Sequence, residues 1–224
     1  TSIGPGNGVQ IANILTLAED PKGRIIFGRT SQGWGVYDTI SKKATSYLKS
    51  NKQTHIGVMS SYCDSYGTMW LGTDDGLWYY NGNKPGIITP ASLSQIQHPL
   101  LSEKTNISAI KQWGNYLLIG KGQRLLLLPL GASASYATQP IQLRYLHPFE
   151  LPMTSGVEQN AMLVDHRDSS VCVATTDNVF QVMLKPWLQQ TLYKAEPSIS
   201  IITGTDTLLA KSGQCIQLPP TSNG

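Results

Sequence analysis

Two stretches of the sequence share one pattern, and this repeat constrains the fold more than any other feature. "ILTLAEDPKGRIIFGRTSQGWGVYD" begins at Ile14, and "IGVMSSYCDSYGTMWLGTDDGLWYYN" begins at Ile56. Each reads as an apolar strand, an Asp-x-x-Gly turn, a second apolar strand that ends in Gly, and a third strand rich in aromatic residues. Asp20 matches Asp64 at an offset of 44 residues. The chain is therefore expected to consist of repeated units.

Three later stretches keep the strand pattern but lose the Asp-x-x-Gly turn. They begin at Ile107, Met162 and Ile199. In every unit a small residue ends the second strand, and these anchor residues are Gly28, Gly72, Gly120, Ala174 and Ala210. The spacings between anchors are 44, 48, 54 and 36 residues. A chain of 224 residues thus divides into five units of about 45 residues each.

A period near 45 residues, with three or four short strands per unit, is typical of β-propeller blades. None of the units shows the 3.6-residue apolar period of a helix, whereas residues 179–182 alternate as a strand does. We predict an all-β fold, a single β-propeller domain over residues 1–224 with about five blades. Fourth strands are expected in the connectors at 44–48 and 141–145, and a short helix near 91–97.

The Asp-x-x-Gly turn has a structural explanation. Its carboxylate can accept backbone N–H bonds, and its glycine supplies a positive φ. The following Met69-Trp70-Leu71 is wholly apolar, which predicts burial on both faces between neighbouring blades. Gly72 at its end suits a close backbone approach. Because the turn recurs at Asp20, we interpret Asp64 as structural rather than catalytic.

The two clear units resemble a known family, the two-component regulator propeller repeat. The second unit carries its pattern at Asp64, Gly67, Trp70, Leu71, Gly72, Thr73, Gly76, Leu77, Tyr80 and Asn81. The first unit matches well, although Ile26 and Phe27 stand where the family prefers Trp followed by Ile or Leu. The other three units match by period only. The motif therefore covers about a quarter of the 224 residues strongly.

The resemblance implies a function and a location. In that family such repeats form the extracytoplasmic sensor region of bacterial hybrid histidine kinases that respond to glycans. Nothing in the sequence resembles a kinase, a response regulator or a DNA-binding module. We therefore expect a periplasmic or extracellular sensor region trimmed from a longer protein, with a carbohydrate or other small molecule as ligand and a homodimer through the sensor region as a further expectation.

Composition excludes several other classes. Only 14% of residues are charged, against roughly 25% in typical soluble domains. The net charge is +3, and the 17 basic residues are scattered instead of forming a stripe with interleaved aromatics, so no nucleic-acid partner is expected. The longest apolar stretch, 116–130, is interrupted by polar residues. Membrane contact is therefore expected only through segments outside this sequence.

Cysteines and histidines give no metal or cofactor motif. The three cysteines, Cys63, Cys172 and Cys215, are far apart and lack a CxxC, which favours free thiols. The four histidines form neither H-x-H nor H-E-x-x-H. We predict no catalysis, no cofactor and no metal. The competing interpretation is a propeller lyase or hydrolase that uses His166 beside Asp165 and Asp168, although this cluster is also typical of a polar turn.

Propellers bind ligands at the mouth of the central channel or across one face. Exposed aromatic residues with polar neighbours suit carbohydrate, so the candidate ligand-binding residues are Trp34, His55, Trp113 and Arg124. Trp34 aligns with Leu77 and could instead belong to the core. The function that we expect is a non-catalytic, ligand-binding sensor propeller. A carbohydrate-active propeller enzyme and a pure protein-interaction scaffold stay open as alternatives.

The ends of the sequence suggest how the ring could close. Residues 8–12 alternate as a strand does, and the fifth unit lacks a connector strand after residues 215–218. Pairing of these two segments would close a five-bladed ring and remove exposed sheet edges. The alternative is that the chain is a fragment of a longer propeller with an open edge at each end.

Overall fold

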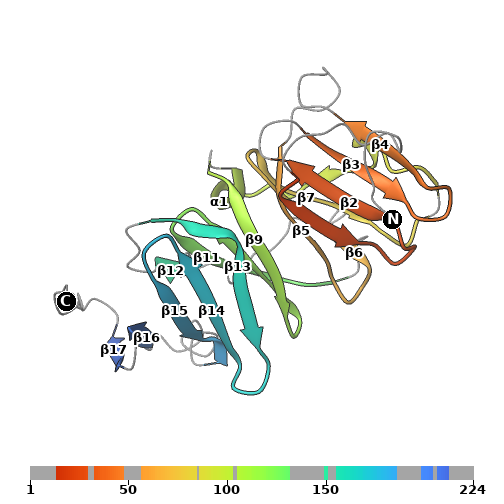
Figure 1. Cartoon of the computed structure of the whole chain (residues 1–224). Coiled ribbons are helices and arrows are strands. Elements are labelled where there is room, and N and C mark those ends of the chain that lie inside the picture. The colour runs from red at the N-terminus through yellow and green to blue at the C-terminus, as the bar shows by residue number, and fades with distance from the viewer. Residues whose placement is uncertain are drawn as a thin grey trace.

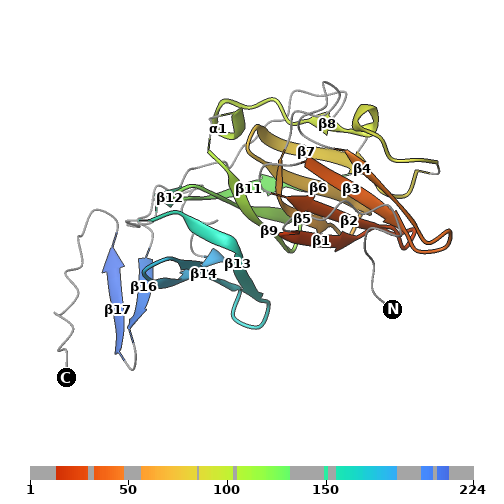
Figure 2. The same ribbon diagram turned by 45° about the horizontal axis from the view of Figure 1, so that its top comes forward.

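The computed structural model describes residues 14–29, 33–47, 57–84, 86–102, 105–131, 149–150, 155–185, 198–203 and 206–211 (Figures 1 and 2). The described strands form four antiparallel sheets. In each sheet, strands that follow one another in the chain lie side by side. The predicted all-β fold is therefore confirmed, and four consecutive meanders of this kind are typical of propeller blades.

The first two sheets have four strands each. The first sheet contains β1 (Thr16–Glu19), β2 (Ile25–Arg29), β3 (Gly33–Asp38) and β4 (Lys43–Tyr47). The second sheet contains β5 (Val58–Cys63), β6 (Thr68–Thr73), β7 (Gly76–Asn81) and β8 (Ser94–Gln95). β4 confirms the strand expected at 44–48. Where a short helix was expected near 91–97, the chain forms a 3₁₀ turn (Pro90–Ser92) followed by β8.

The other two sheets follow after a short helix, α1 (Pro99–Ser102). The third sheet contains β9 (Ile107–Trp113), β10 (Tyr116–Lys121), β11 (Arg124–Pro129) and β12 (Phe149–Glu150). The fourth sheet contains β13 (Val157–Asp165), β14 (Ser170–Thr175), β15 (Val179–Met183), β16 (Ser198–Thr203) and β17 (Asp206–Lys211). The strand expected at 141–145 lies outside the described residues.

The sheets pack face to face in chain order. One apolar cluster, which includes Trp34 and Leu71, joins the first sheet to the second. A second cluster, around Trp70 and Leu117, joins the second sheet to the third, and a third, around Leu118 and Phe180, joins the third to the fourth. β6 is buried along its whole length, as its apolar sequence predicts. The first strands of consecutive sheets contact one another in the order β1, β5, β9 and β13 (Figure 2). We call these four the inner strands.

Three anchor glycines lie where a second strand touches the next sheet. A Cβ atom built on Gly28 would lie 2.6 Å from the carbonyl oxygen of Val58. One built on Gly72 would lie 2.7 Å from the carbonyl oxygen of Ile107, and one on Gly120 would lie 2.8 Å from Cγ1 of Val157. These contacts are too short for a side chain, so glycine permits the close approach that the sequence predicted. Ala174 holds the corresponding place in β14.

The Asp-x-x-Gly turns form as predicted. Oδ1 of Asp64 accepts the backbone N–H groups of Tyr66 and Thr68, each at 2.9 Å. Gly67 has φ +77° and Gly23 has φ +76°, the left-handed conformation that glycine tolerates. Asp64 is buried and fully occupied by its own turn. The structure therefore supports the structural interpretation of this residue.

The fifth predicted unit continues the fourth sheet in the described residues. β16 pairs with β15, and β17, which contains Ala210, pairs with β16. In both views β16 and β17 lie at the opposite end of the series from the first sheet (Figures 1 and 2). No closed ring is found among the described strands. The segments expected to close it, 8–12 and 215–218, lie outside the described residues, so ring closure and the five-blade count stay predictions.

No helix in the part of the chain that the structure describes has the length and apolar character needed to cross a bilayer.

Candidate functional site

The first strand of the fourth sheet is interrupted where it faces the other inner strands. Val157 pairs with Thr175 and Met162 pairs with Val173, so five steps along β13 match only two along β14. We call the four residues between these two pairs, 158–161, the inner bulge. Asn160 within it has φ +55°, a left-handed conformation that asparagine adopts more readily than most residues. A bulge of this kind re-aims side chains away from the regular sheet.

The inner bulge reaches the first and second sheets. Nε2 of Gln159 donates a hydrogen bond of 2.8 Å to the carbonyl oxygen of Met59 in β5. Nδ2 of Asn160 donates one of 3.1 Å to the carbonyl oxygen of Leu15, next to β1. These contacts join residues that are 100 and 145 positions apart in the chain. Two amide side chains thus hold three of the four sheets together at the centre.

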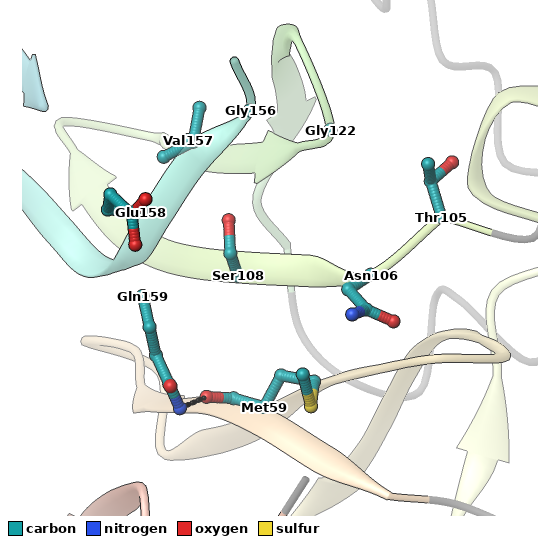
Figure 3. A pocket seen from close by; sticks show the side chains of 9 residues that line it. All are labelled: Met59, Thr105, Asn106, Ser108, Gly122, Gly156, Val157, Glu158 and Gln159. Carbon is teal, nitrogen blue, oxygen red and sulfur yellow. Dashed lines mark hydrogen bonds between the residues drawn. The ribbon is translucent and has the colours of Figure 1, made fainter. Parts of the chain in front are cut away.

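A pocket of about 320 Å³ opens beside the inner bulge (Figure 3). Its wall comes from β5, the segment that enters β9, the turn between β10 and β11, and the start of β13. The lining residues are Met59, Thr105, Asn106, Ser108, Gly122, Gly156, Val157, Glu158 and Gln159. Three sheets therefore contribute to one cavity, which we call the Glu158 pocket.

The chemistry of the Glu158 pocket is mainly neutral and polar. Hydroxyl and amide groups come from Thr105, Asn106, Ser108 and Gln159, and among the described lining residues only Glu158 is charged. Oε1 of Glu158 accepts a 2.6 Å hydrogen bond from the hydroxyl of Thr176. Amides and hydroxyls can both donate and accept hydrogen bonds. This combination suits a ligand that carries several hydroxyl groups better than it suits a metal or a reaction centre.

A buried lysine supports the rim of this pocket. Nζ of Lys121 donates to the carbonyl oxygen of Thr105 at 2.7 Å and to its hydroxyl at 3.2 Å. Lys121 is at the position that follows the anchor Gly120, where the second and fourth sheets have Thr73 and Thr175. Its longer side chain reaches the segment that enters β9. The ammonium group therefore fixes Thr105 at the edge of the cavity.

Trp34, the first candidate for ligand binding, is a core residue. None of its surface is exposed, and its ring lies 4.8 Å from that of Tyr47. It belongs to the cluster between the first two sheets. The alignment with Leu77 had indicated this alternative, and Leu77 is likewise fully buried.

Of the other candidates, Trp113 and Arg124 lie in different places. His55 lies outside the described residues. Trp113, at the far end of β9 from the Glu158 pocket, is half-buried and stacks on Tyr116 at 6.0 Å. Arg124 is half-buried at the start of β11, where it pairs with Lys121, and it does not line the pocket.

His166 lies in an exposed turn between β13 and β14. Beside it, Arg167 donates to both carboxylate oxygens of Asp165, from Nη2 at 2.6 Å and from Nε at 3.1 Å. These bonds lower the pKa of Asp165 to about 2. Asp165 is therefore ionised at neutral pH and engaged with arginine, which fits a polar turn better than an acid/base pair. Within the described residues, no group of three His, Cys, Asp or Glu side chains could hold a metal ion.

The sequence did not identify the residues that line the Glu158 pocket. Asn106, Ser108 and Gln159 belong to no motif, and their proximity depends on how the sheets pack. One signal was available, because the polar run Glu158-Gln159-Asn160 interrupts a strand that otherwise reads as apolar. Such a run at an inner strand indicates a bulge or a site rather than a buried sheet.

No protein-family model and no curated protein matches the sequence. Solved structures do share the fold. The extracellular domain of a candidate hybrid two-component system from B. thetaiotaomicron, BT3049, is 16% identical with a TM-score of 0.54, over 91% of this chain and 27% of that chain. The extracellular domain of a second such protein from the same organism, BT4673, is 13% identical with a TM-score of 0.58, over 89% and 30%.

A third similar structure has a different setting. PorZ of Porphyromonas gingivalis, described as an essential bacterial surface component of the type-IX secretion system, is 15% identical with a TM-score of 0.51, over 76% of this chain and 26% of that chain. The chain spans less than a third of the length of each of these three proteins. At such identities the likeness concerns the fold alone. The same fold therefore occurs in extracellular domains of candidate two-component systems and in a surface component of a secretion system.

Proposed function

We propose that the chain is an extracytoplasmic sensor region that binds a small polar ligand, such as a glycan, without converting it. The Glu158 pocket carries this proposal, because side chains from three sheets meet there around neutral hydrogen-bonding groups. The similar folds of two extracellular domains from candidate two-component systems support the same assignment. Such a role requires a membrane segment and a histidine kinase, and we propose that a longer protein supplies both.

A ligand in this pocket could act on the whole domain. Its wall includes Gln159, which also bonds to Met59 of the second sheet at 2.8 Å. A ligand that bonds to the Gln159 amide competes with this contact or strengthens it. Binding would therefore change how tightly the sheets are joined, and a change of this kind could pass to neighbouring modules.

A hydrolase is less well supported by the same pocket. Most glycoside hydrolases use two carboxylates that flank the bond to be cleaved. Among the described lining residues Glu158 is the one carboxylate, and its Oε1 is engaged with Thr176. We therefore propose binding rather than turnover.

Binding of glycans to the complete chain, measured by calorimetry over a panel of neutral oligosaccharides, tests the proposal. Asn106→Ala should weaken binding of any oligosaccharide that the wild-type chain binds. Asn115→Ala is the matched control, because Asn115 is an exposed asparagine in the turn at the other end of β9. Equal binding by both variants would exclude the Glu158 pocket as the ligand site. Product formation in the same samples would favour the enzyme alternative.

The proposed homodimer and the scaffold alternative need a separate measurement. Light scattering on the purified chain, with and without the bound oligosaccharide, reports its mass directly. A ligand-dependent dimer supports a sensor that signals through association. A chain that binds none of the sugars and remains a monomer favours a pure interaction scaffold.

A further inference from the structure

A second pocket, of about 310 Å³, lies further along the same inner strands. Its lining consists of residues 14–17, Ser61, Lys111 and Asn160. Ser61 is two residues beyond Met59 on β5, and Lys111 is three residues beyond Ser108 on β9. Asn160 of the inner bulge thus lines this second cavity, whereas Glu158 and Gln159 line the first. We call it the Lys111 pocket.

The two pockets differ in charge. Among the described residues, Glu158 is the one charged residue that lines the first pocket, and Lys111 is the one that lines the second. In the part of the chain that the structure describes, the ammonium group of Lys111 has no hydrogen bond or ion pair. Its ammonium group lies 6.0 Å from the centre of the Tyr62 ring, a cation–π contact that uses none of its three N–H donors.

The acidic turn that follows β5 does not supply a partner for this lysine. Asp64 follows β5 directly, but its two oxygens accept the N–H groups of Tyr66 and Thr68 and the indole N–H of Trp70. Its charge is therefore already met by hydrogen bonds from its own turn and from Trp70 in β6. The half-buried Lys111 lines a cavity whose described lining residues include no carboxylate.

Other groups in the Lys111 pocket fit an oxyanion. The hydroxyls of Thr16 and Ser61 lie 2.7 Å apart, so one donates to the other and the acceptor hydroxyl keeps its own proton to donate. Ile14 and Leu17 are exposed and line the same cavity. A cation, a hydroxyl donor and an apolar wall together suit a charged head group attached to a less polar body.

We propose that the Lys111 pocket is an anion site that takes the carboxylate, sulfate or phosphate group of a small ligand. This site is separate from the Glu158 pocket and is chemically its opposite. The inner bulge lies between the two and contributes to both. An acidic sugar is one ligand that offers such a group, and a free inorganic anion is another source of the same chemistry.

Titration of the complete, ¹⁵N-labelled chain with acetate, sulfate and phosphate tests the site, with ionic strength held constant by chloride. The backbone amides of Ser61 and Lys111 should shift and saturate. Lys111→Met keeps the aliphatic stem over Tyr62 but removes the charge, and it should raise the apparent Kd about tenfold or more, as expected for loss of one charged hydrogen bond. Lys111→Arg should retain the response.

Lys43→Met is the matched control, because it removes the same charge from an exposed position on β4. It should leave the titration unchanged. A comparison of glucuronate, glucose and acetate separates an acidic sugar from a free ion as the ligand. If the site takes an acidic sugar, glucuronate should bind more tightly than acetate, and glucose should not. Shifts that do not saturate, or that persist undiminished in Lys111→Met, would overturn the proposal. Because Asn106→Ala does not alter this pocket, failure here leaves the proposed function of the Glu158 pocket untouched, and the reverse also holds.

Discussion

The indole Nε1 of Trp70 donates a 2.8 Å hydrogen bond to Oδ2 of Asp64. Both residues are buried, and the other carboxylate oxygen of Asp64 accepts two backbone N–H groups of its turn. The tryptophan of this repeat therefore has two roles. It fills the space between the second and third sheets, and it supplies the last donor that a buried carboxylate requires.

The first sheet meets the same requirement with a different residue. Nε of Arg24 donates to Oδ2 of Asp20 at 2.7 Å, while the backbone N–H groups of Lys22 and Arg24 bond to Oδ1. The Arg24 guanidinium also donates to the carbonyl oxygens of Gly82 and Gly86, at 3.0 and 2.7 Å. Arg24 therefore replaces the indole donor and also ties the first sheet to the segment that follows β7.

Trp70 separates packing from hydrogen bonding in one experiment. We expect Trp70→Ala to lower the free energy of unfolding by about 3–5 kcal/mol, because a fully buried aromatic side chain is lost. Trp70→Phe keeps most of the ring but leaves Oδ2 of Asp64 without its donor, so a smaller loss of about 1.5–3 kcal/mol is expected. Urea unfolding followed by circular dichroism measures both. A loss below about 1 kcal/mol for the alanine variant would contradict this role.

Arg24→Met should destabilise the fold strongly. The change leaves a buried carboxylate at Asp20 without its ionic partner, for which a loss of about 3–5 kcal/mol is expected. Arg167→Met is the control. Arg167 contacts Asp165 through its Nε and Nη2 atoms, as Arg24 contacts Asp20, but at an exposed site. Exposed pairs contribute little, so the control should unfold at the same urea concentration as the wild type. Equal effects of the two changes would show that burial does not govern the Asp20 pair.

These two turns show what sequence reasoning could and could not reach. Asp20 and Asp64 were recognised because their turns are local, and a local pattern of four residues fixes both the acceptor and the positive-φ glycine. The donor to Oδ2 was not predicted, because its place differs between the units. It is Arg24, four residues after Asp20, in the first unit and Trp70, six residues after Asp64, in the second. The anchors Gly28, Gly72 and Gly120 were recognised through their period before their contacts were known.

The candidate site was less predictable for a physical reason. Gln159 and Asn160 bond to carbonyl groups 100 and 145 residues away, and no local pattern records such contacts. Trp34 was a candidate for carbohydrate binding because aromatic residues with polar neighbours suit sugars, whereas its alignment with Leu77 indicated a place in the core. The packing of one sheet on the next decides whether such a residue is exposed or belongs to the core. This packing cannot be read from the sequence of a single strand.

The anchor glycines should differ in their tolerance of alanine. In Gly72→Ala the new methyl group meets the backbone carbonyl of Ile107, which cannot move without disturbing β9. In Gly120→Ala it meets only the side chain of Val157, which can shift. We expect a loss of about 1–3 kcal/mol for Gly72→Ala and a smaller loss for Gly120→Ala. Thermal unfolding of both variants gives the order, and a larger effect at Gly120 would contradict the close backbone approach.

Cys63 should react slowly with alkylating agents. Burial, followed by the charges of Asp64 and Asp20, raises the pKa of its thiol to about 11. At pH 8 only about 0.1% would then be thiolate, roughly a hundredth of the fraction for an unperturbed thiol, and the thiolate is the reactive form. The rate with iodoacetamide should rise about tenfold per pH unit until the pH approaches this pKa.

A chain in which Cys172 and Cys215 are changed to Ser isolates this rate. Mass spectrometry of the labelled protein at pH 7, 8 and 9 follows it. A rate at pH 8 equal to that of a free thiol such as glutathione would show that Cys63 is neither desolvated nor influenced by the two carboxylates.

The inner bulge should hold β1 against the rest of the domain. Asn160→Gly preserves the left-handed backbone without strain and removes only the amide that bonds to Leu15. Combined with Gln159→Ala, it also removes the amide that bonds to Met59 at 2.8 Å and to Leu15 at 3.5 Å, and a total loss of about 1–3 kcal/mol is expected. The effect should be local, because β1 would lose its tie to β13 while the fourth sheet keeps its own ladder. The N–H of Leu15, which donates to the carbonyl oxygen of Gly28 at 2.9 Å, should therefore exchange with solvent at least about tenfold faster, whereas the N–H of Val182 in β15 should not.

Hydrogen exchange followed by NMR compares the two sites in one sample. Equal acceleration at both would mean that the bulge stabilises the domain globally, and no change at Leu15 would mean that the amide bridges do not hold β1.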